Sequence, residues 1–593
     1  MKNKRNVLFP IMVLKKKYTL TRHWITVFVL FALTPMAFAQ NKAKQIDELM
    51  RRYVDNGQFN GTVLVTDNGK LIFKKGYGLA NMEWNIPNEP DTRFRLGSIT
   101  KQFTSMLIMQ LVEQGKLRLE GKVTDYLTDY PKAAGDKITL HHLLTHTSGI
   151  PNYSDLPDYR TFERNRFKPA ELVKKFSELP LTFEPGSAFA YSNSGYILLG
   201  AIIEKVTGKP YEKVLQENIF TPLQMLNTGY DMSYKILPNR ASGYQRWNLV
   251  YENAPYIDMS IPYAAGALYS TVEDLALWDQ ALYTDKLLSA SSKAILFTPY
   301  KDGYAYGWGV SKMQVGQLKD SIELMQHQGA VNGFNTSLIR IPKNKQLVVL
   351  LDNTGSANLI AIRNNILNIL YNQPFDLPKV SVAYVLGNAI QNNSLSDALN
   401  QYEKIKKQPA YNLDEGEINQ MGYNLISVGK IKEAIALMNI NVIQFSRSAN
   451  AWDSRGEAYM LNGEKAKAIP DYKKSLELDP YSMNAIRKLN ELGEKVPDPK
   501  EATVEDKILD TYVGKYELRP SFVISITKEK GRLYAQATNQ PRHELFAESA
   551  TKFFMKAADD RIVFVKSEQG SPEKLILFQN GQEIHGKRLL REL

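Results

Sequence analysis

The chain has 593 residues, 44% of them hydrophobic and 23% charged, which is an ordinary composition for a globular protein of three or four domains. Cysteine is absent, which excludes disulfides, thiol nucleophiles and cysteine metal sites. The formal charge of +12 falls to +5 without the seven cations of the first 39 residues, and no basic patch interleaved with aromatic residues indicates nucleic-acid binding.

Residues 1–39 have the pattern of a bacterial signal peptide. A cationic leader precedes the apolar run WITVFVLFALTPMAFA, which ends in the A-x-A cleavage site Ala37-Phe38-Ala39 before Gln40. We therefore expect an exported protein, either periplasmic or secreted. The alternative is an uncleaved membrane anchor, and this segment is the only part of the sequence that indicates contact with a membrane.

Residues 45–375 mix strand and helix patterns and predict one α+β domain. The stretch NGTVLVTDNGKLIFKKGYG alternates around the turn signal Asn68-Gly69, and NTSLIRIPKNKQLVVLLDN predicts a second hairpin that turns between Pro342 and Lys345. Helical patterns lie between them, at 101–114, 138–145, 194–206 and 272–282. Strands at both ends predict an antiparallel sheet closed by the domain's own termini, with flanking helices and a helical lobe.

Residues 380–495 predict α-helical repeats. At a spacing of 34, four pairs of residues recur: Gly422 and Gly456, Gly429 and Gly463, Ala434 and Ala468, and Ile435 and Ile469. This period is typical of tetratricopeptide repeats. Pro470 departs from the pattern, and an earlier degraded copy includes Ala398 and Tyr402. Because so few repeats rarely stand alone, we expect them to dock on a neighbouring domain and to offer a site for a protein partner. The alternative is a generic helical linker.

Residues 505–593 follow the linker PDPKEATVED and alternate like strands. The stretches FVISITKEKGRLYAQA, KFFMKAADDRIVFVKS and EKLILFQNGQEIHGKR predict a small antiparallel sheet or barrel.

A serine three residues before a lysine can form a catalytic pair, but the pattern S-x-x-K occurs five times here. The serines are Ser98, Ser427, Ser525, Ser549 and Ser571. Positions three apart share a face on a helix and point to opposite faces on a strand. Ser98 precedes a helical pattern and meets this condition, whereas Ser525 lies in a strand pattern. A helix N-cap is the alternative role for Ser98.

Two further motifs complete a set. Tyr191-Ser192-Asn193 and His327-Gln328-Gly329 follow Ser98 and Lys101 in chain order. This set resembles the serine β-lactamase-related family, which includes class C β-lactamases, DD-peptidases (penicillin-binding proteins), D-aminopeptidases and related esterases. The stretches LLTHTSGIPNY, FEPGSAFAYSNSGYILLG, AAGALYSTVEDLALW and YGWGV support the resemblance, which covers residues 45–375.

The resemblance implies a role for each motif. Ser98 is expected to be the nucleophile, Lys101 a proton acceptor whose pKa is lowered by burial and neighbouring charge, and Tyr191 a proton shuttle. Asn193 is expected to hold Lys101 and the substrate amide. The resemblance implies neither a metal nor another cofactor.

The third motif is expected to contribute to substrate binding through His327, Gly329 and Ala330. The backbone N–H of Ala330, with that of Ser98, would form an oxyanion hole. Many β-lactamases have lysine where this chain has His327, and the H-x-G form resembles DD-peptidases more than efficient β-lactamases. Gln328 departs from the threonine common in the family, which removes a hydroxyl donor for a substrate carboxylate.

The sequence therefore predicts an exported serine hydrolase that acts through an acyl-enzyme on small peptide, amide or ester substrates, in the manner of DD-peptidases, D-aminopeptidases or esterases. One alternative is a true β-lactamase. Another is a non-catalytic envelope scaffold that binds a partner through residues 380–495. His142 and His146 have the i, i+4 spacing of half a zinc site, but no third ligand is evident, which favours a structural role near the site.

Overall fold

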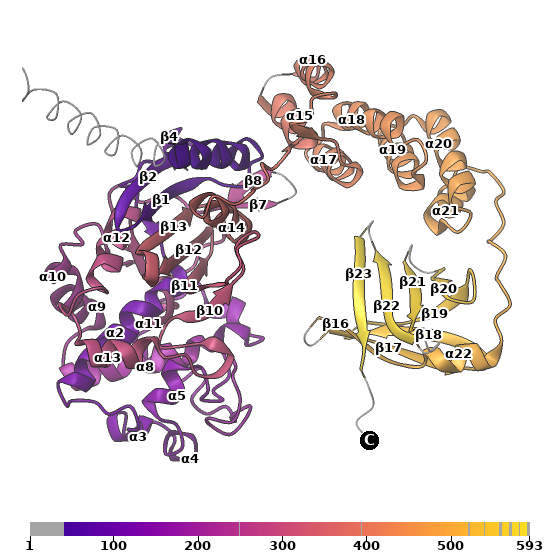
Figure 1. The fold of residues 1–593 in the computed structure, drawn as a ribbon. Helices are drawn as coiled ribbons and strands as arrows, with labels where there is room; N and C mark the ends of the chain where they lie inside the picture. Colours follow the sequence, from indigo (N-terminus) through magenta and orange to yellow (C-terminus); the bar gives the residue numbers. More distant parts are fainter. Residues whose placement is uncertain are drawn as a thin grey trace, which may run out of the picture. The chain divides into compact units, whose positions relative to one another are not determined.

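The structure is a computed structural model that describes residues 41–247, 250–392, 394–519, 522–538, 540–556, 560–567, 572–579 and 582–589. The signal peptide predicted for residues 1–39 lies outside the described residues. The chain divides into two units between Lys379 and Val380, and each unit is described by itself (Figure 1). Among the described helices, none has the length and apolar character needed to cross a membrane.

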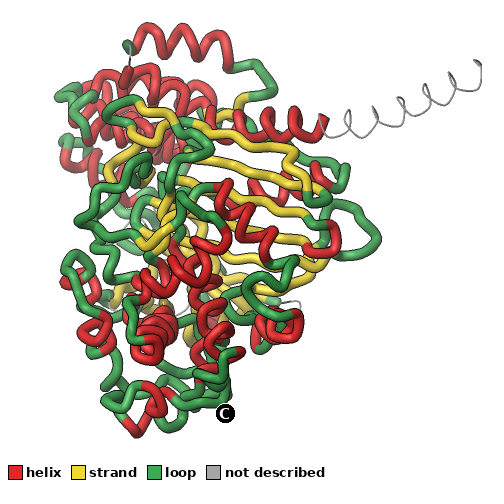
Figure 2. Tube along the Cα trace, turned by 90° about the vertical axis from the view of Figure 1, so that its left-hand side faces the viewer, coloured by secondary structure: helices red, strands yellow, loops and turns green. Residues whose placement is uncertain are grey.

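A six-stranded antiparallel sheet forms the centre of the first unit, and Figure 2 shows its strands in yellow. The strand order is β10 (Gly309–Met313), β11 (Ile322–Val331), β12 (Phe334–Ile341), β13 (Gln346–Asp352), β1 (Gly61–Asp67) and β2 (Lys70–Tyr77). β1 pairs with β13, so the two ends of the domain close the sheet as predicted. Both predicted hairpins are present, and Asn68 and Gly69 have the positive φ angles that a tight turn requires.

Both faces of this sheet are buried, because alternate residues of a strand point to opposite faces. On β13, Val349 and Leu351 belong to one core, whereas Val348 and Leu350 belong to another. The helical residues 41–55 and α14 (Leu359–Leu370) contribute to the second core, and the helices described next contribute to the first. The first core is the one that positions the site.

The four predicted helices of the first unit are present as α2 (Thr100–Glu113), α5 (Leu140–Leu144), α8 (Asn193–Thr207) and α12 (Val272–Ala281). α5 is shorter than predicted, because Thr145 leaves the helical region and His146 has a φ of 56°. The remaining elements are β3 (Leu79–Asn81), β4 (Ile86–Pro87), β5 (Phe94–Arg95), η1 (Gly97–Ile99), α3 (Val123–Tyr126), α4 (Lys132–Gly135), η2 (Tyr153–Asp155), α6 (Tyr159–Phe162), α7 (Pro169–Val173), α9 (Tyr211–Leu215), η3 (Gln216–Phe220), α10 (Thr221–Leu223), β6 (Gly229–Tyr230), β7 (Tyr244–Trp247), β8 (Val250–Asn253), α11 (Tyr263–Gly266), β9 (Leu268–Ser270), α13 (Ala290–Phe297), η4 (Lys301–Gly303) and η5 (Pro342–Asn344).

The second unit begins with helical repeats, as predicted. Its helices are α15 (Val382–Asn392), α16 (Leu395–Ile405), α17 (Glu415–Ser427), α18 (Ile431–Gln444), α19 (Ala449–Leu461), α20 (Lys465–Leu478) and α21 (Met483–Glu491), with the short strands β14 (Val380–Ser381) and β15 (Tyr411–Asn412). A side chain at Gly456 would stand 3.1 Å from the ring of Tyr472, so the small residue lets α19 and α20 approach. Pro470 lies inside α20, which continues past it.

The chain then forms α22 (Asp506–Tyr512) and a closed antiparallel barrel. The strands are β16 (Gly514–Arg519), β17 (Phe522–Glu529), β18 (Arg532–Ala537), β19 (Arg542–Ala547), β20 (Lys552–Phe554), β21 (Arg561–Lys566), β22 (Pro572–Gln579) and β23 (Gln582–Arg588). This confirms the predicted small β-domain. Phe554 of the barrel packs with Met483 and Ile486 of α21, so the last repeat helix docks on its neighbour within the second unit.

Candidate active site

Ser98 lies on the short turn η1, directly ahead of α2. Gly97 has a φ of 53°, in the region that favours glycine. A Cβ there would stand 2.6 Å from the backbone nitrogen of Ala330 on β11. Glycine is therefore required at 97 both by its backbone conformation and by the close passage of β11. The result is that Ser98 is held beside the end of β11 and at the N-terminus of α2, where backbone N–H groups favour negative charge.

Lys101 lies one turn further on and points back to Ser98. Its Nζ is 2.9 Å from Ser98 Oγ, 2.8 Å from Asn193 Oδ1 and 2.9 Å from the carbonyl oxygen of Ala265. The side chain is 0% exposed. The amide and backbone oxygens are both acceptors, so each takes one N–H of the lysine. In the neutral amine the lone pair then remains for the hydroxyl proton of Ser98.

Burial lowers the pKa of Lys101 well below its ordinary value, because removal from water penalises the charged form. In the described part of the chain, the hydrogen-bond partners of Lys101 are a hydroxyl, an amide oxygen and a backbone carbonyl, and none is a carboxylate. The sequence predicted that burial and neighbouring charge would both lower the pKa of Lys101. The structure shows the effect of burial and no effect of a neighbouring charge. A neutral amine in contact with a serine hydroxyl can act as a general base.

Asn193 begins α8 and is held on three sides. Its backbone N–H donates to Asn152 Oδ1 at 3.0 Å, and its Nδ2 donates to Ser154 Oγ at 3.4 Å. Its Oδ1 accepts from Lys101. Asn193 therefore fixes Lys101, as the sequence predicted. Its second expected role, binding of the substrate amide, stays a prediction.

Tyr191 stands at the open side of this group. Its ring lies 4.9 Å from Lys101 Nζ, and its side chain is 38% exposed. Burial of the hydroxyl raises the pKa of Tyr191, and a hydrogen bond with Ser98 acts in the opposite direction. Tyr191 therefore remains a protonated phenol while Lys101 is the neutral base. Environments that move two pKa values apart assign the acid and the base of a site.

His327 lies on β11, 6.3 Å from Tyr191 between ring centroids. Its Nδ1 is 2.6 Å from the carbonyl oxygen of Gln328, and its Nε2 is 2.9 Å from the hydroxyl of Tyr304. The carbonyl can only accept, so Nδ1 carries the proton and Nε2 accepts from Tyr304. Burial is the main cause that lowers the pKa of His327 to about 3, and Lys101 acts in the same direction when its amine is protonated. The ring is therefore neutral with both nitrogens occupied, which argues against a cation for a substrate carboxylate.

Gly329 and Ala330 follow His327 along the same strand. A Cβ at Gly329 would stand 1.9 Å from the carbonyl oxygen of Leu96, so only glycine fits there. This close contact brings the backbone of Ala330 to Gly97 and hence beside Ser98. The arrangement is compatible with the predicted pairing of two backbone N–H groups as an oxyanion hole.

The sequence missed several groups that complete the site. The carbonyl of Ala265, on α11, holds Lys101, and the ring of Tyr196 lies 5.5 Å from its Nζ. Tyr304 orients His327. Two of these groups lie in stretches that had been noted for their resemblance, since Ala265 is in AAGALYS and Tyr196 is in YSNSGY. The same holds for Asn152, the partner of Asn193, which is in SGIPNY. No sequence signal pointed to Tyr304.

Among the other serines of the S-x-x-K pattern, Ser427 donates to the carbonyl of Asn424 near the end of α17, and Ser549 accepts from backbone N–H groups in a turn. Both are local structural contacts. Ser571 lies outside the described residues, and Ser525 lies on β17.

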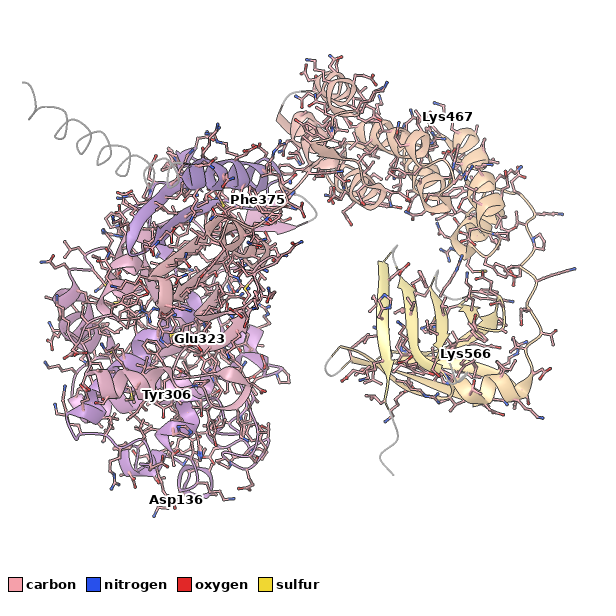
Figure 3. All side chains as sticks on the ribbon, in the orientation of Figure 1. Asp136, Tyr306, Glu323, Phe375, Lys467 and Lys566 are labelled. Carbon is pink, nitrogen blue, oxygen red and sulfur yellow. The ribbon has the colours of Figure 1, made fainter. Side chains whose placement is uncertain are left out.

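The HHLLTH segment does not assemble a metal site among the described residues, where no three histidine or acidic side chains come together. His141 Nδ1 lies 2.8 Å from the hydroxyl of Tyr306, which is labelled in Figure 3. His142 Nδ1 accepts from the backbone N–H of Thr139. His146 packs against Tyr191 instead.

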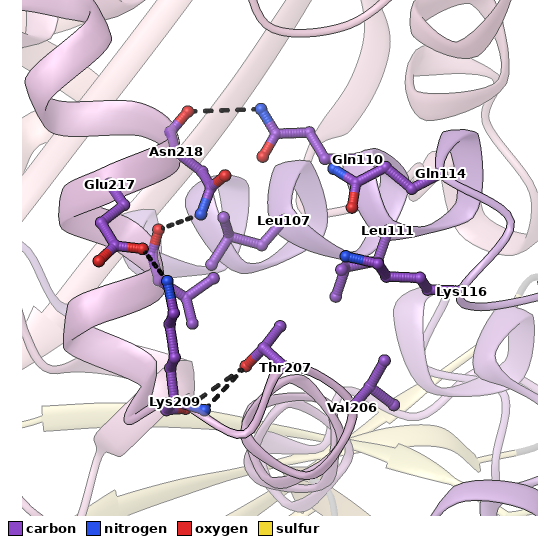
Figure 4. Close-up of a pocket in the computed structure, with 11 residues that line it drawn as sticks. Leu107, Gln110, Leu111, Gln114, Lys116, Val206, Thr207, Lys209, Glu217 and Asn218 are labelled. Carbon is purple, nitrogen blue, oxygen red and sulfur yellow. Dashed lines mark hydrogen bonds and ion pairs between the residues drawn. The ribbon is translucent and has the colours of Figure 1, made fainter.

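A cavity of about 190 Å³ lies between α2, α8 and η3 (Figure 4). Lys209 and Glu217 form an ion pair of 2.6 Å at its edge, and Leu107 and Val206 contribute to its apolar lining. Gln110, which also lines it, is twelve residues beyond Ser98, or about 18 Å along a helix. None of the predicted site residues lines this cavity, so it is separate from the candidate site.

Comparisons with known proteins give three matches along the chain. Residues 46–373 match the family described as Beta-lactamase, residues 449–482 match the tetratricopeptide repeat, and residues 498–588 match a domain of unknown function. Penicillin-binding protein 4* of Bacillus subtilis (strain 168) is 25% identical over 577 residues, which cover 93% of this chain and 99% of that protein.

Two further similarities each cover a little more than half of the chain. Putative penicillin-binding protein PbpX of Bacillus subtilis (strain 168) is 32% identical over 336 residues, 56% of this chain and 81% of that protein. The crystal structure of a penicillin binding protein from Bacillus halodurans is 28% identical and covers 55% of this chain and 98% of that one, with a TM-score of 0.48.

Proposed function

We propose a function for this chain on the premise that it belongs to the Beta-lactamase family, which matches more than half of its residues. The chain is a serine hydrolase of the penicillin-binding-protein type. The observation that carries the finer proposal is the contact between a fully buried lysine and a serine at a helix N-terminus. We assign Ser98 as the nucleophile and Lys101 as its base.

In the first half of the reaction, Ser98 Oγ attacks the carbonyl carbon of the substrate while its proton passes to Lys101 Nζ. The negative charge that develops on the substrate oxygen is stabilised by the N–H groups of Ser98 and Ala330. The bond to the leaving group then breaks. Tyr191 gives its proton to the leaving amine or alcohol and recovers one from Lys101, which leaves an ester on Ser98.

In the second half, water attacks the ester carbonyl from the open side, where Tyr191 is exposed. Lys101 takes a proton from the water. The bond between the acyl carbon and Ser98 Oγ then breaks, Lys101 returns the proton to Ser98, and the acid product leaves. Asn193 supports both halves, because it fixes the amine of Lys101 and can offer hydrogen bonds to a substrate amide.

The substrates proposed are small peptides, amides or esters, with peptides of D-amino acids first among them. The two relatives from Bacillus subtilis are named as a penicillin-binding protein and a putative one, which supports acylation of Ser98 by penicillins. The neutral His327 gives no cation that would favour efficient β-lactam hydrolysis. We therefore favour a DD-peptidase, D-aminopeptidase or esterase over a true β-lactamase.

The segments outside the first unit carry two further parts of the proposal. The pattern of residues 1–39 supports export, and the tetratricopeptide match supports a protein partner for the helical repeats. The presence of a complete set of catalytic residue types argues against a purely non-catalytic scaffold.

The test uses the full mature chain with a fluorescent penicillin and a fluorophosphonate, followed by a panel of D-Ala-D-Ala peptides, D-aminoacyl amides, short acyl esters and nitrocefin. We expect labelling that Ser98→Ala abolishes, turnover of at least one peptide, amide or ester, and little turnover of nitrocefin. Labelling that survives in Ser98→Ala would overturn the assignment of the nucleophile.

A further inference from the structure

His146 accepts hydrogen bonds from the residues on both sides of Tyr191. The backbone N–H of Ala190 donates to the carbonyl oxygen of His146 at 2.9 Å, and the backbone N–H of Ser192 donates to His146 Nδ1 at 3.1 Å. The two residues that flank Tyr191 in the chain are therefore both anchored to one histidine, 45 residues earlier in the sequence. One contact is made by the backbone of His146 and the other by its imidazole ring.

The ring of His146 also packs on the ring of Tyr191. Their centroids are 4.2 Å apart at an angle of 37°. Tyr304 and Tyr196 enclose the other sides of the imidazole, at 4.6 Å and 5.2 Å. His146 is 1% exposed, so its position is determined by this aromatic group and by the two hydrogen bonds. Backbone and ring of Tyr191 are thus restrained by the same residue.

Two features of His146 are unfavourable for the free energy of folding. Its φ of 56° is uncommon for a residue with a side chain. Because Nδ1 accepts from Ser192, the proton of the neutral ring is on Nε2, which finds no hydrogen-bond partner among the described residues. Strained backbone and unpartnered buried polar groups concentrate at functional sites. His327, by contrast, has both ring nitrogens engaged.

We propose that His146 is the positioning residue for Tyr191, because it fixes the two backbone neighbours of this tyrosine and the plane of its ring. The inference rests on the proposed function, in which Tyr191 carries a proton to the leaving group. Among the described residues, His146 makes no hydrogen bond with Ser98. It acts by holding the phenol hydroxyl where the leaving group departs, so its loss is expressed only through Tyr191.

Two variants of His146 and one control separate its hydrogen bond to Ser192 from its ring contact with Tyr191. His146→Ala removes the acceptor for Ser192, the ring and the tolerance for positive φ. His146→Asn keeps a side-chain acceptor and tolerates positive φ, but lacks the ring. His142→Ala is the matched control, because His142 lies on α5 in the same segment and caps that helix without touching Tyr191.

The readout is kcat/KM of the full chain on the amide or ester that it hydrolyses, because the amine or alcohol that leaves takes its proton from Tyr191. Since small displacements of a catalytic group cost up to about 100-fold, we expect a loss of about 50-fold to 100-fold for His146→Ala and about 10-fold for His146→Asn. The rate for His142→Ala should equal that of the wild type. In a background of Tyr191→Phe, both His146 variants should cause less than about a 3-fold further loss.

The same fold-loss in both backgrounds would overturn the inference, because a merely structural role does not require the hydroxyl of Tyr191. Should His146→Ala fail to fold, the His146→Asn cycle gives the answer, and an unchanged rate for His146→Asn in the wild-type background would also overturn it. A wild-type chain that is never labelled would instead count against the proposed function itself.

Discussion

The tetrapeptide Ser-Ile-Thr-Lys occurs twice, and its two copies differ in almost everything except their letters. Ser98 and Lys101 belong to η1 and α2, where positions three apart share a face, and their side chains meet at 2.9 Å. Ser525 and Lys528 lie on β17, where positions three apart point to opposite faces. This confirms the prediction that only the first copy brings its serine and lysine together.

The surroundings of the two lysines move their pKa values in opposite directions. Lys101 is buried without a paired carboxylate in the described structure, and burial lowers its pKa. Lys528 lies 2.8 Å from Asp510 and 3.4 Å from Asp506, and the hydrogen bond with Asp510 is the largest influence that raises its pKa. The pKa of each lysine is therefore determined by the residues around it, which the tetrapeptide does not encode.

The largest expected effect comes from the two serines. Ser98→Ala should lower kcat/KM on an acyl ester by at least about 10⁴-fold, because loss of a serine nucleophile has an effect of this order or larger in hydrolases. Ser525→Ala is the control and should leave kcat/KM unchanged. A comparable loss from both changes would show that the two copies do not differ in the way described.

The two lysines give the next effect. Lys101→Met should lower kcat/KM by about 10²-fold to 10⁴-fold, since this is the range for loss of a general base. The buried aliphatic stem has room for methionine, so the variant is expected to retain its circular dichroism spectrum. Lys528→Met removes only surface contacts and should leave the rate at the wild-type value. A Lys101→Met enzyme within 10-fold of the wild type would exclude Lys101 as the base.

A buried carboxylate of the first unit extends the comparison to stability. Asp352 is fully buried, and burial raises its pKa from 3.8 to about 6, although N–H groups of Asn60 and Thr354 oppose the shift. Because the folded pKa is the higher one, the favourable contribution is complete below about pH 4 and is lost as the pH rises through 6. We expect a decrease of about 2 kcal/mol from this group between pH 4 and pH 7.

The measurement is urea unfolding of the first unit, followed by the fluorescence of the buried Trp278 and Trp308. In Asp352→Asn the dependence on pH between 4 and 7 should become weaker by this amount. Asp510→Asn, which changes an exposed carboxylate beside Lys528, serves as the control and should leave the dependence unchanged. An equal slope for the wild type and Asp352→Asn would contradict the raised pKa.

The smallest expected effect is an absence of titration at His327. Since its pKa lies at about 3, His327 stays neutral between pH 5 and pH 9. The ratio of kcat/KM for a peptide with a free C-terminal carboxylate to that for its amide should therefore be constant over this range. A ratio that falls above about pH 7 would indicate that the histidine binds the carboxylate as a cation.

Much of the fold could be predicted because it depends on local patterns. The turn at Asn68-Gly69, the strand alternation of β12 and β13, and the spacing of 34 between Gly422 and Gly456 each reflect short-range geometry. The short α5 could not be predicted, because it ends where His146 takes a positive φ to reach Tyr191 and Ser192. That contact spans 45 residues of sequence and has no local signal.

In the site too, residue types in motifs could be predicted, whereas long-range contacts could not. Ser98, Lys101, Tyr191 and Asn193 were predicted from motifs, and the structure brings them together. The carbonyl of Ala265 could not be predicted, because a backbone oxygen leaves no trace in residue identity. The neutral state of His327 was likewise beyond the sequence, since it depends on burial and on Tyr304.

The most direct test of the central claim is the mass of the protein after brief exposure to a fluorophosphonate, followed by peptide mapping. We expect a single modification on the peptide that contains Ser98 and none on the peptide that contains Ser525. Modification of any other serine, or an enzyme that hydrolyses esters while Ser98 stays unmodified, would contradict it.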